Sequence, residues 1–110
     1  GPRSPLPDSE SQEPSPEQLL DAVRQMKVSD LLLSTAATLA QLGFAKLDEP
    51  TRDLEQARLA IEAMKALLGA LEGAVPEEVH RDFSQVVANL QLAYADAASA
   101  ASERAAGKPD

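Results

Sequence analysis

Between residues 51 and 72, apolar side chains recur at steps of three and four residues, and this spacing constrains the fold more than any other feature. An α-helix repeats every 3.6 residues, so such steps place all the apolar side chains on one helical face. The series consists of Leu54, Ala57, Ile61, Met64, Leu68 and Leu71. No segment alternates apolar and polar residues as a half-buried strand does. The sequence therefore predicts a helix over 51–72 and a protein of the all-α class.

The segment 16–42 has the same period and begins with a capping-box signal, Ser-Pro-Glu-Gln at 15–18. A Ser-Asp pair at 29–30 offers a second start, and Gly43 is a natural stop. The segment is either one long helix or two helices with a kink near 28–29. Its apolar face comprises Leu19, Leu20, Val23, Met26, Leu31, Leu32, Leu39 and Leu42.

The last predicted helix covers 76–104 and opens on Pro76, which is followed by two glutamates that suit a helix N-terminus. We expect Gly73 to end the preceding helix, and Gly69 to permit close contact between that helix and a neighbour. The apolar seam of the last helix consists of Val79, Phe83, Val86, Leu90, Tyr94 and Ala97.

The two ends of the chain are predicted to be tails. Residues 1–15 are rich in Pro, Ser and acids, so we expect disorder there, and we expect residues 105–110 to fray. The remaining domain, 16–104, should form a small antiparallel bundle of three to four helices. Because many seam positions are Ala or Thr, the core should be thin, and we expect a homodimer to complete it.

The charge balance limits the classes of partner. The chain has a formal net charge of −8 at pH 7, which disfavours nucleic acid and anionic membrane surfaces and favours a protein partner that is basic. It contains no cysteine, so a disulfide scaffold is excluded. No apolar run approaches the ~20 residues needed to span a bilayer, and no signal-peptide pattern is present. We therefore expect a cytoplasmic protein without membrane insertion.

Residues that could carry chemistry are scarce. The single histidine, His80, is interpreted as a solvated residue on a helix surface. Two acidic pairs, at 48–49 and 77–78, do not form a carboxylate dyad, because adjacent helical residues point to different sides. No phosphate-binding loop, nucleophile elbow or metal-binding spacing occurs. We expect no catalytic residue, cofactor or bound metal ion, and hence no enzyme.

The apolar stripes are the remaining candidates for an interaction site. They either form an internal core or bind a partner helix, and both roles require the same pattern. The candidate residues are Leu54, Ile61, Met64, Leu68, Phe83, Val86, Leu90 and Tyr94.

Four segments follow one another in a recognisable order. They read Val-Ser-Asp-Leu-Leu-Leu-Ser at 28–34, Ala-Gln-Leu-Gly-Phe-Ala at 40–45, Arg-Asp-Leu-Glu-Gln-Ala-Arg-Leu-Ala-Ile at 52–61 and Asn-Leu-Gln-Leu-Ala-Tyr at 89–94. This order resembles the bacterial family named domain of unknown function 1844, in the versions from high-GC bacteria. The resemblance covers 28–99 and is most specific at 53–58, while Gln41 stands where a histidine is common. It implies a small cytoplasmic helical protein with no established activity.

Three charged residues match positions of that family, although a core seam would not require them. They are Asp53, Glu55 and Arg58. Acids are favoured at a helix start, which is one explanation. The other is a polar contact at an interface, in which Arg58 meets an acid on another helix.

These observations favour a non-enzymatic helical module for protein–protein interaction or structure that associates with itself. One alternative, suggested by the resemblance, is an accessory factor of translation or ribosome assembly that binds a protein component. A second alternative is a binder of small apolar ligands, which would occupy a cavity left by the Ala-rich core.

Overall fold

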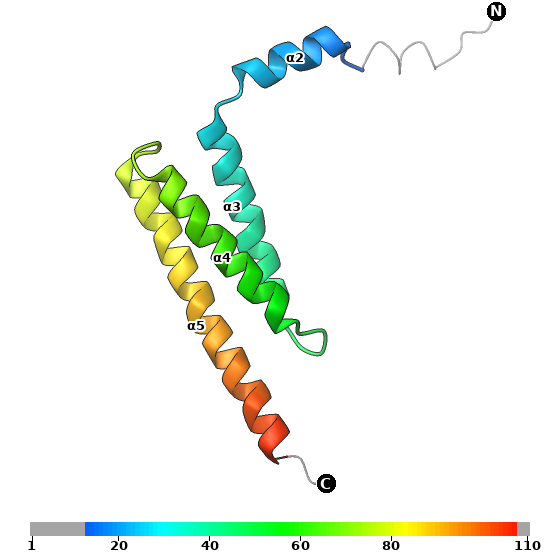
Figure 1. Ribbon diagram of the computed structural model, residues 1–110, viewed down its shortest axis with the longest axis vertical. Coiled ribbons are helices and arrows are strands. Elements are labelled where there is room, and N and C mark those ends of the chain that lie inside the picture. Colours follow the sequence, from blue (N-terminus) through cyan, green and yellow to red (C-terminus); the bar gives the residue numbers. More distant parts are fainter. Residues whose placement is uncertain (1–12, 108–110) are drawn as a thin grey trace, which may run out of the picture.

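The computed structural model describes residues 13–107, which fold into four α-helices with no strand among them (Figure 1). The helices are α2 (Pro16–Gln25), α3 (Val28–Ala45), α4 (Leu54–Leu71) and α5 (Glu77–Gly107). The predicted all-α class is confirmed. Residues 1–12 and 108–110 of the predicted tails lie outside the described residues. Residues 105–107, expected to fray, extend α5 instead, in part because alanine is the strongest helix former.

A capping box starts α2, as the sequence predicts. The Gln18 backbone N–H donates to Ser15 Oγ at 3.1 Å, and the Ser15 backbone N–H donates to Gln18 Oε1 at 2.9 Å. Pro16 occupies the first turn, where its missing N–H costs no hydrogen bond.

The segment 16–42 forms two helices, and the break lies at Met26 and Lys27 rather than near 28–29. Both residues have extended backbones, with φ −72° and ψ 141° at Met26 and φ −91° and ψ 135° at Lys27. The Lys27 carbonyl accepts from the backbone N–H groups of Asp30 and Leu31, in the first turn of α3. Ser29 therefore lies inside α3, and the predicted second start is two residues too late.

Gly43 does not stop α3, which continues to Ala45. Gly43 is buried where α3 meets α4 and α5. A Cβ atom at this position would lie 2.8 Å from Leu90 Cδ2 and 3.2 Å from Ala60 Cβ. The glycine therefore permits close packing of three helices, and the prediction of a stop was wrong.

The ends of α4 and α5 are close to their predicted positions. Helix α4 begins at Leu54 rather than at residue 51, because Asp53 caps it: the Asp53 Oδ1 accepts from the Gln56 N–H at 3.2 Å. Gly73 follows α4 with φ +80°, a conformation that suits glycine, so the expected end is confirmed. Gly69 was expected at a close helix contact, but a Cβ there would have nothing within 4 Å.

Helices α3, α4 and α5 form an antiparallel bundle, whereas α2 projects away and contacts no other helix of residues 13–107 (Figure 1). The molecule measures 73 × 43 × 17 Å, so it is elongated and flat. Five of the eleven buried hydrophobic residues are alanines, which keeps the helices close and the core thin. The central cluster consists of Ala40, Leu47, Ala57, Ile61, Met64, Val87, Leu90 and Ala97.

By length and composition alone, α3 is the one helix among the described residues that could cross a membrane. The core helix of a soluble protein passes the same test when it is mostly buried, whereas only 17% of α3 is buried, although it packs against both other helices of the bundle. The expectation that no apolar run could span a bilayer therefore does not hold by this criterion.

Candidate protein-interaction site

The predicted apolar stripe of α4 and α5 faces the inside of the bundle. Ile61, Met64 and Leu90 are buried in the central cluster. The other members are half-buried and pack against this cluster; they are Leu54, Leu68, Phe83, Val86 and Tyr94. Three of the eight stripe residues are therefore buried core, and the five half-buried residues form the edge that a partner could reach.

The three predicted polar residues do not form an interhelical contact. Asp53 caps α4, and Glu55 is exposed in the first turn of that helix. Arg58 is exposed beside Tyr94 at a hollow of about 310 Å³ between α4 and α5. No ion pair among residues 13–107 involves Arg58, so the expected contact with an acid on another helix is not formed there.

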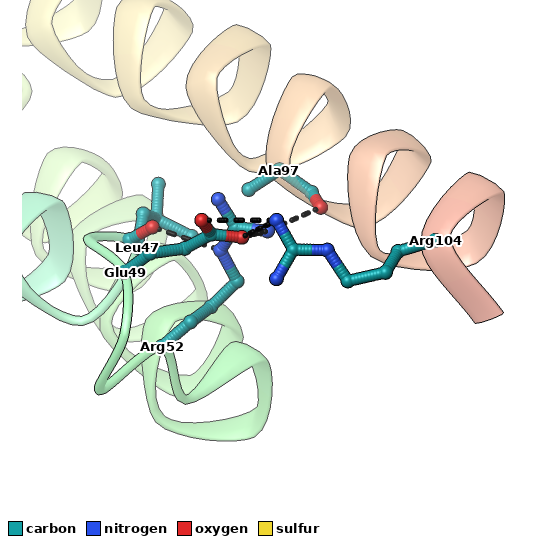
Figure 2. A network of polar contacts seen from close by, with 5 residues as sticks. All are labelled: Leu47, Glu49, Arg52, Ala97 and Arg104. Carbon is teal, nitrogen blue, oxygen red and sulfur yellow. Dashed lines mark hydrogen bonds and ion pairs between the residues drawn. The ribbon is translucent and has the colours of Figure 1, made fainter. Parts of the chain in front are cut away.

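Arg52 makes the polar link between the α3–α4 loop and α5 (Figure 2). Its Nε donates to the Leu47 carbonyl at 2.9 Å, and its Nη1 donates to the Ala97 carbonyl at 3.2 Å. The same nitrogen lies 3.4 Å from Glu49 Oε2, and Arg104 Nη2 lies 3.0 Å from that oxygen. The guanidinium groups of Arg52 and Arg104 therefore both contact the Glu49 carboxylate, and these contacts link the α3–α4 loop to α5.

One signal for this role was visible in the sequence. Arg52 lies just before the N-terminus of α4, where a positive charge opposes the helix dipole. The positive end of α4 does not stabilise a cation, so the side chain is expected to bond to carbonyl or carboxylate oxygens outside that helix. Because its Nε and Nη1 atoms are already engaged, we assign Arg52 to holding the fold together.

His80 also serves the fold, and it is half-buried rather than solvated. Its Nε2 lies 3.0 Å from the Leu68 carbonyl. That carbonyl belongs to the last turn of α4, where no backbone N–H of the same helix follows to bond it. Donation from the His80 ring supplies this missing partner and links α5 to α4.

An apolar groove of about 350 Å³ lies between α3 and α5. Two alanines of α3 and larger side chains of α5 line it, so it has room for inserted side chains. Asp82 is its one charged lining residue. The α3/α5 groove is lined by Leu33, Ala37, Ala40, Val79, Asp82, Phe83 and Val86.

The apolar face of α2 is exposed along its whole length. This α2 face consists of Leu19, Leu20, Val23 and Met26, of which 52%, 53%, 62% and 53% is exposed. It continues around the corner into α3 through Val28 and Leu31, which are 70% and 50% exposed. The corner forms an apolar hollow of about 280 Å³.

No group of three His, Asp or Glu side chains placed to hold a metal ion occurs within residues 13–107. Comparison of the chain with protein-family models, curated proteins and solved structures gives no match. The resemblance to the domain of unknown function 1844 stays a prediction.

Proposed function

We propose that this chain is a non-enzymatic helical interaction module that associates with itself. The observation that carries the proposal is the exposed α2 face. A contiguous exposed apolar patch of this kind marks an interaction site. Isolated helices shorter than about 12–15 residues are marginal in water, and α2 has 10 residues and no contact with the bundle. Burial of its face against a partner would supply the missing stabilisation.

The charge of the chain supports a protein as the partner. With a formal net charge of −8, the surface repels phosphate backbones and anionic lipid headgroups. We propose a cytoplasmic location, which rests on the family resemblance. A role in translation stays a prediction that rests on the family resemblance.

Sedimentation equilibrium of the full chain at micromolar concentrations tests the proposal. We expect a mass of twice the 11.6 kDa of one chain. A monomer mass across the whole micromolar range would overturn self-association.

The α3/α5 groove favours one second candidate, a binder of small apolar ligands. Its volume of about 350 Å³ lies within the range of ligand pockets, which is roughly 300–1,000 Å³. Native mass spectrometry after incubation with a long-chain fatty acid tests this function. Spectra of bare protein alone would contradict it.

A further inference from the structure

The α3/α5 groove occupies the position that a fourth helix takes in an antiparallel bundle. Helices α3, α4 and α5 run down, up and down in Figure 1, so the space between the first and the last of them is the open side of the bundle. The chain contains one further helix with an unpartnered apolar face, which is α2. We propose that α2 of a second copy occupies the α3/α5 groove, and that two copies exchange α2 reciprocally.

The dimensions of the two surfaces agree. The α2 face runs from Leu19 to Met26, and the α3 side of the groove runs from Leu33 to Ala40, so each covers eight residues. At 1.5 Å per residue, both surfaces extend about 10–12 Å along a helix axis. The small side chains of Ala37 and Ala40 leave space for the Leu and Val side chains of a docked helix.

The backbone at the corner favours a second copy over the chain's own α2. Met26 and Lys27 are both extended, and they direct α2 away from its own bundle (Figure 1). A two-residue connection is at the lower limit for consecutive helices that pack antiparallel. Return of α2 to its own groove would require new backbone angles at these residues. Docking in a second copy keeps the observed corner, and short connections of this kind favour exchange of helices between copies.

Local charge does not oppose docking, although the overall charge is repulsive. The groove carries one acid, Asp82, whereas α2 and its corner are neutral, since Glu17 and Asp21 balance Arg24 and Lys27. Stable interfaces bury about 1,200–2,000 Å² in total. Reciprocal exchange buries two α2 faces and two grooves, which doubles the area that a single docked helix would bury.

Disulfide trapping in the full chain distinguishes the possible occupants of the groove. The chain has no native cysteine, so the variant Leu20→Cys/Ala37→Cys carries only the introduced pair, and both native residues are exposed. We expect mild oxidation to give a covalent dimer on a non-reducing gel. An internal disulfide in a monomer would show that the chain's own α2 fills the groove. Absence of any disulfide, with the helix content unchanged, would also overturn the proposal.

Charged substitutions on the two surfaces provide a second test. We expect Val23→Asp and Ala37→Glu each to weaken dimerisation by about tenfold or more, as measured by sedimentation. The matched controls Gln25→Asp and Thr35→Glu add the same charges on the opposite sides of α2 and α3, and should leave the dimer intact. Mixing equal amounts of Val23→Asp and Ala37→Glu restores one intact contact, so native mass spectrometry should show heterodimer well above the twofold excess over either homodimer that random pairing gives.

The proposed exchange of α2 between copies rests on the proposed self-association, and experiments can refute the exchange without refuting self-association. A wild-type chain that remains monomeric refutes both. A wild-type dimer that survives Val23→Asp and Ala37→Glu refutes the exchange alone and leaves self-association in place through another surface.

Discussion

Gly43 and Gly69 show what a residue type alone leaves open. The sequence predicts a helix stop at Gly43 and a close helix contact at Gly69, whereas the structure has the close contact at Gly43 and places Gly69 inside α4 without one. Gly43 lies against Leu90 and Ala60, whereas Gly69 faces open space. Glycine signals only that a side chain is missing. Whether a glycine ends a helix or permits a close contact depends on where the helices cross, and the crossing points are set by tertiary packing.

Replacement of each glycine by alanine should change stability in opposite directions. Gly69→Ala should raise the free energy of unfolding by about 0.5–1 kcal/mol, because alanine is the better helix former and nothing obstructs its Cβ. Gly43→Ala brings the same gain but crowds the buried Leu90 side chain, and overpacking costs about 1–3 kcal/mol. We expect a net loss of about 1 kcal/mol. Urea unfolding followed by circular dichroism measures both, and equal effects would contradict the close packing at Gly43.

Substitution of Arg52 and of Arg58 should have different effects on the free energy of unfolding. The Arg52 side chain is 19% exposed and donates to two backbone carbonyls. Arg52→Ala leaves the Leu47 carbonyl without this partner and removes the second bond of the Ala97 carbonyl, which also accepts within α5, so unfolding should become easier by about 1–2 kcal/mol. Arg52→Lys should recover little of this, because an ammonium group lacks the fork geometry. Arg58→Ala should change urea unfolding by less than about 0.5 kcal/mol, and a larger loss would mean that Arg58 has a contact after all.

At the scale of helices, the periodic pattern was sufficient to place α4 and α5, and the Ser15 capping box placed the start of α2. The break between α2 and α3 could not be placed, because Met26 and Lys27 are ordinary helix formers without a turn signal. The polar link of Arg52 was missed for a related reason. The position of Arg52 before α4 indicates that it needs oxygen partners but not which ones, because two of its partners are the backbone carbonyls of Leu47 and Ala97.

Removal of the two helix caps should have different effects on the dimer and on the bundle. Ser15→Ala removes the α2 cap, and because a helix of 10 residues is marginal by itself, dimerisation should weaken by about 0.5–2 kcal/mol. Asp53→Ala removes the α4 cap and should lower the unfolding free energy of the bundle by about 1 kcal/mol. Sedimentation and urea unfolding of both variants separate the two effects. Loss of bundle stability in Ser15→Ala would show that α2 belongs to the bundle of its own chain.

For the molecule as a whole, the pattern of apolar residues predicts that each stripe is buried. It does not identify the surface against which each stripe packs. The stripes of α2 and α4 both follow the helical period, yet one is exposed and the other forms the core. The difference comes from connection length, since the α3–α4 and α4–α5 loops allow antiparallel packing, whereas the extended corner at 26–27 holds α2 outward.

Salt should strengthen the dimer, and this follows from the charge of the whole chain. Two copies at −8 each bring a charge of −16 together, while the proposed contact is mostly apolar. Raising the ionic strength from about 0.01 M to 0.1 M shortens the Debye length from about 30 Å to 10 Å, which screens this repulsion and leaves apolar burial nearly unchanged. The dissociation constant from sedimentation should therefore fall as sodium chloride is added. An interface held mainly by opposite charges, such as Asp82 with Lys27, would weaken instead, so the sign of the salt dependence decides which contribution dominates.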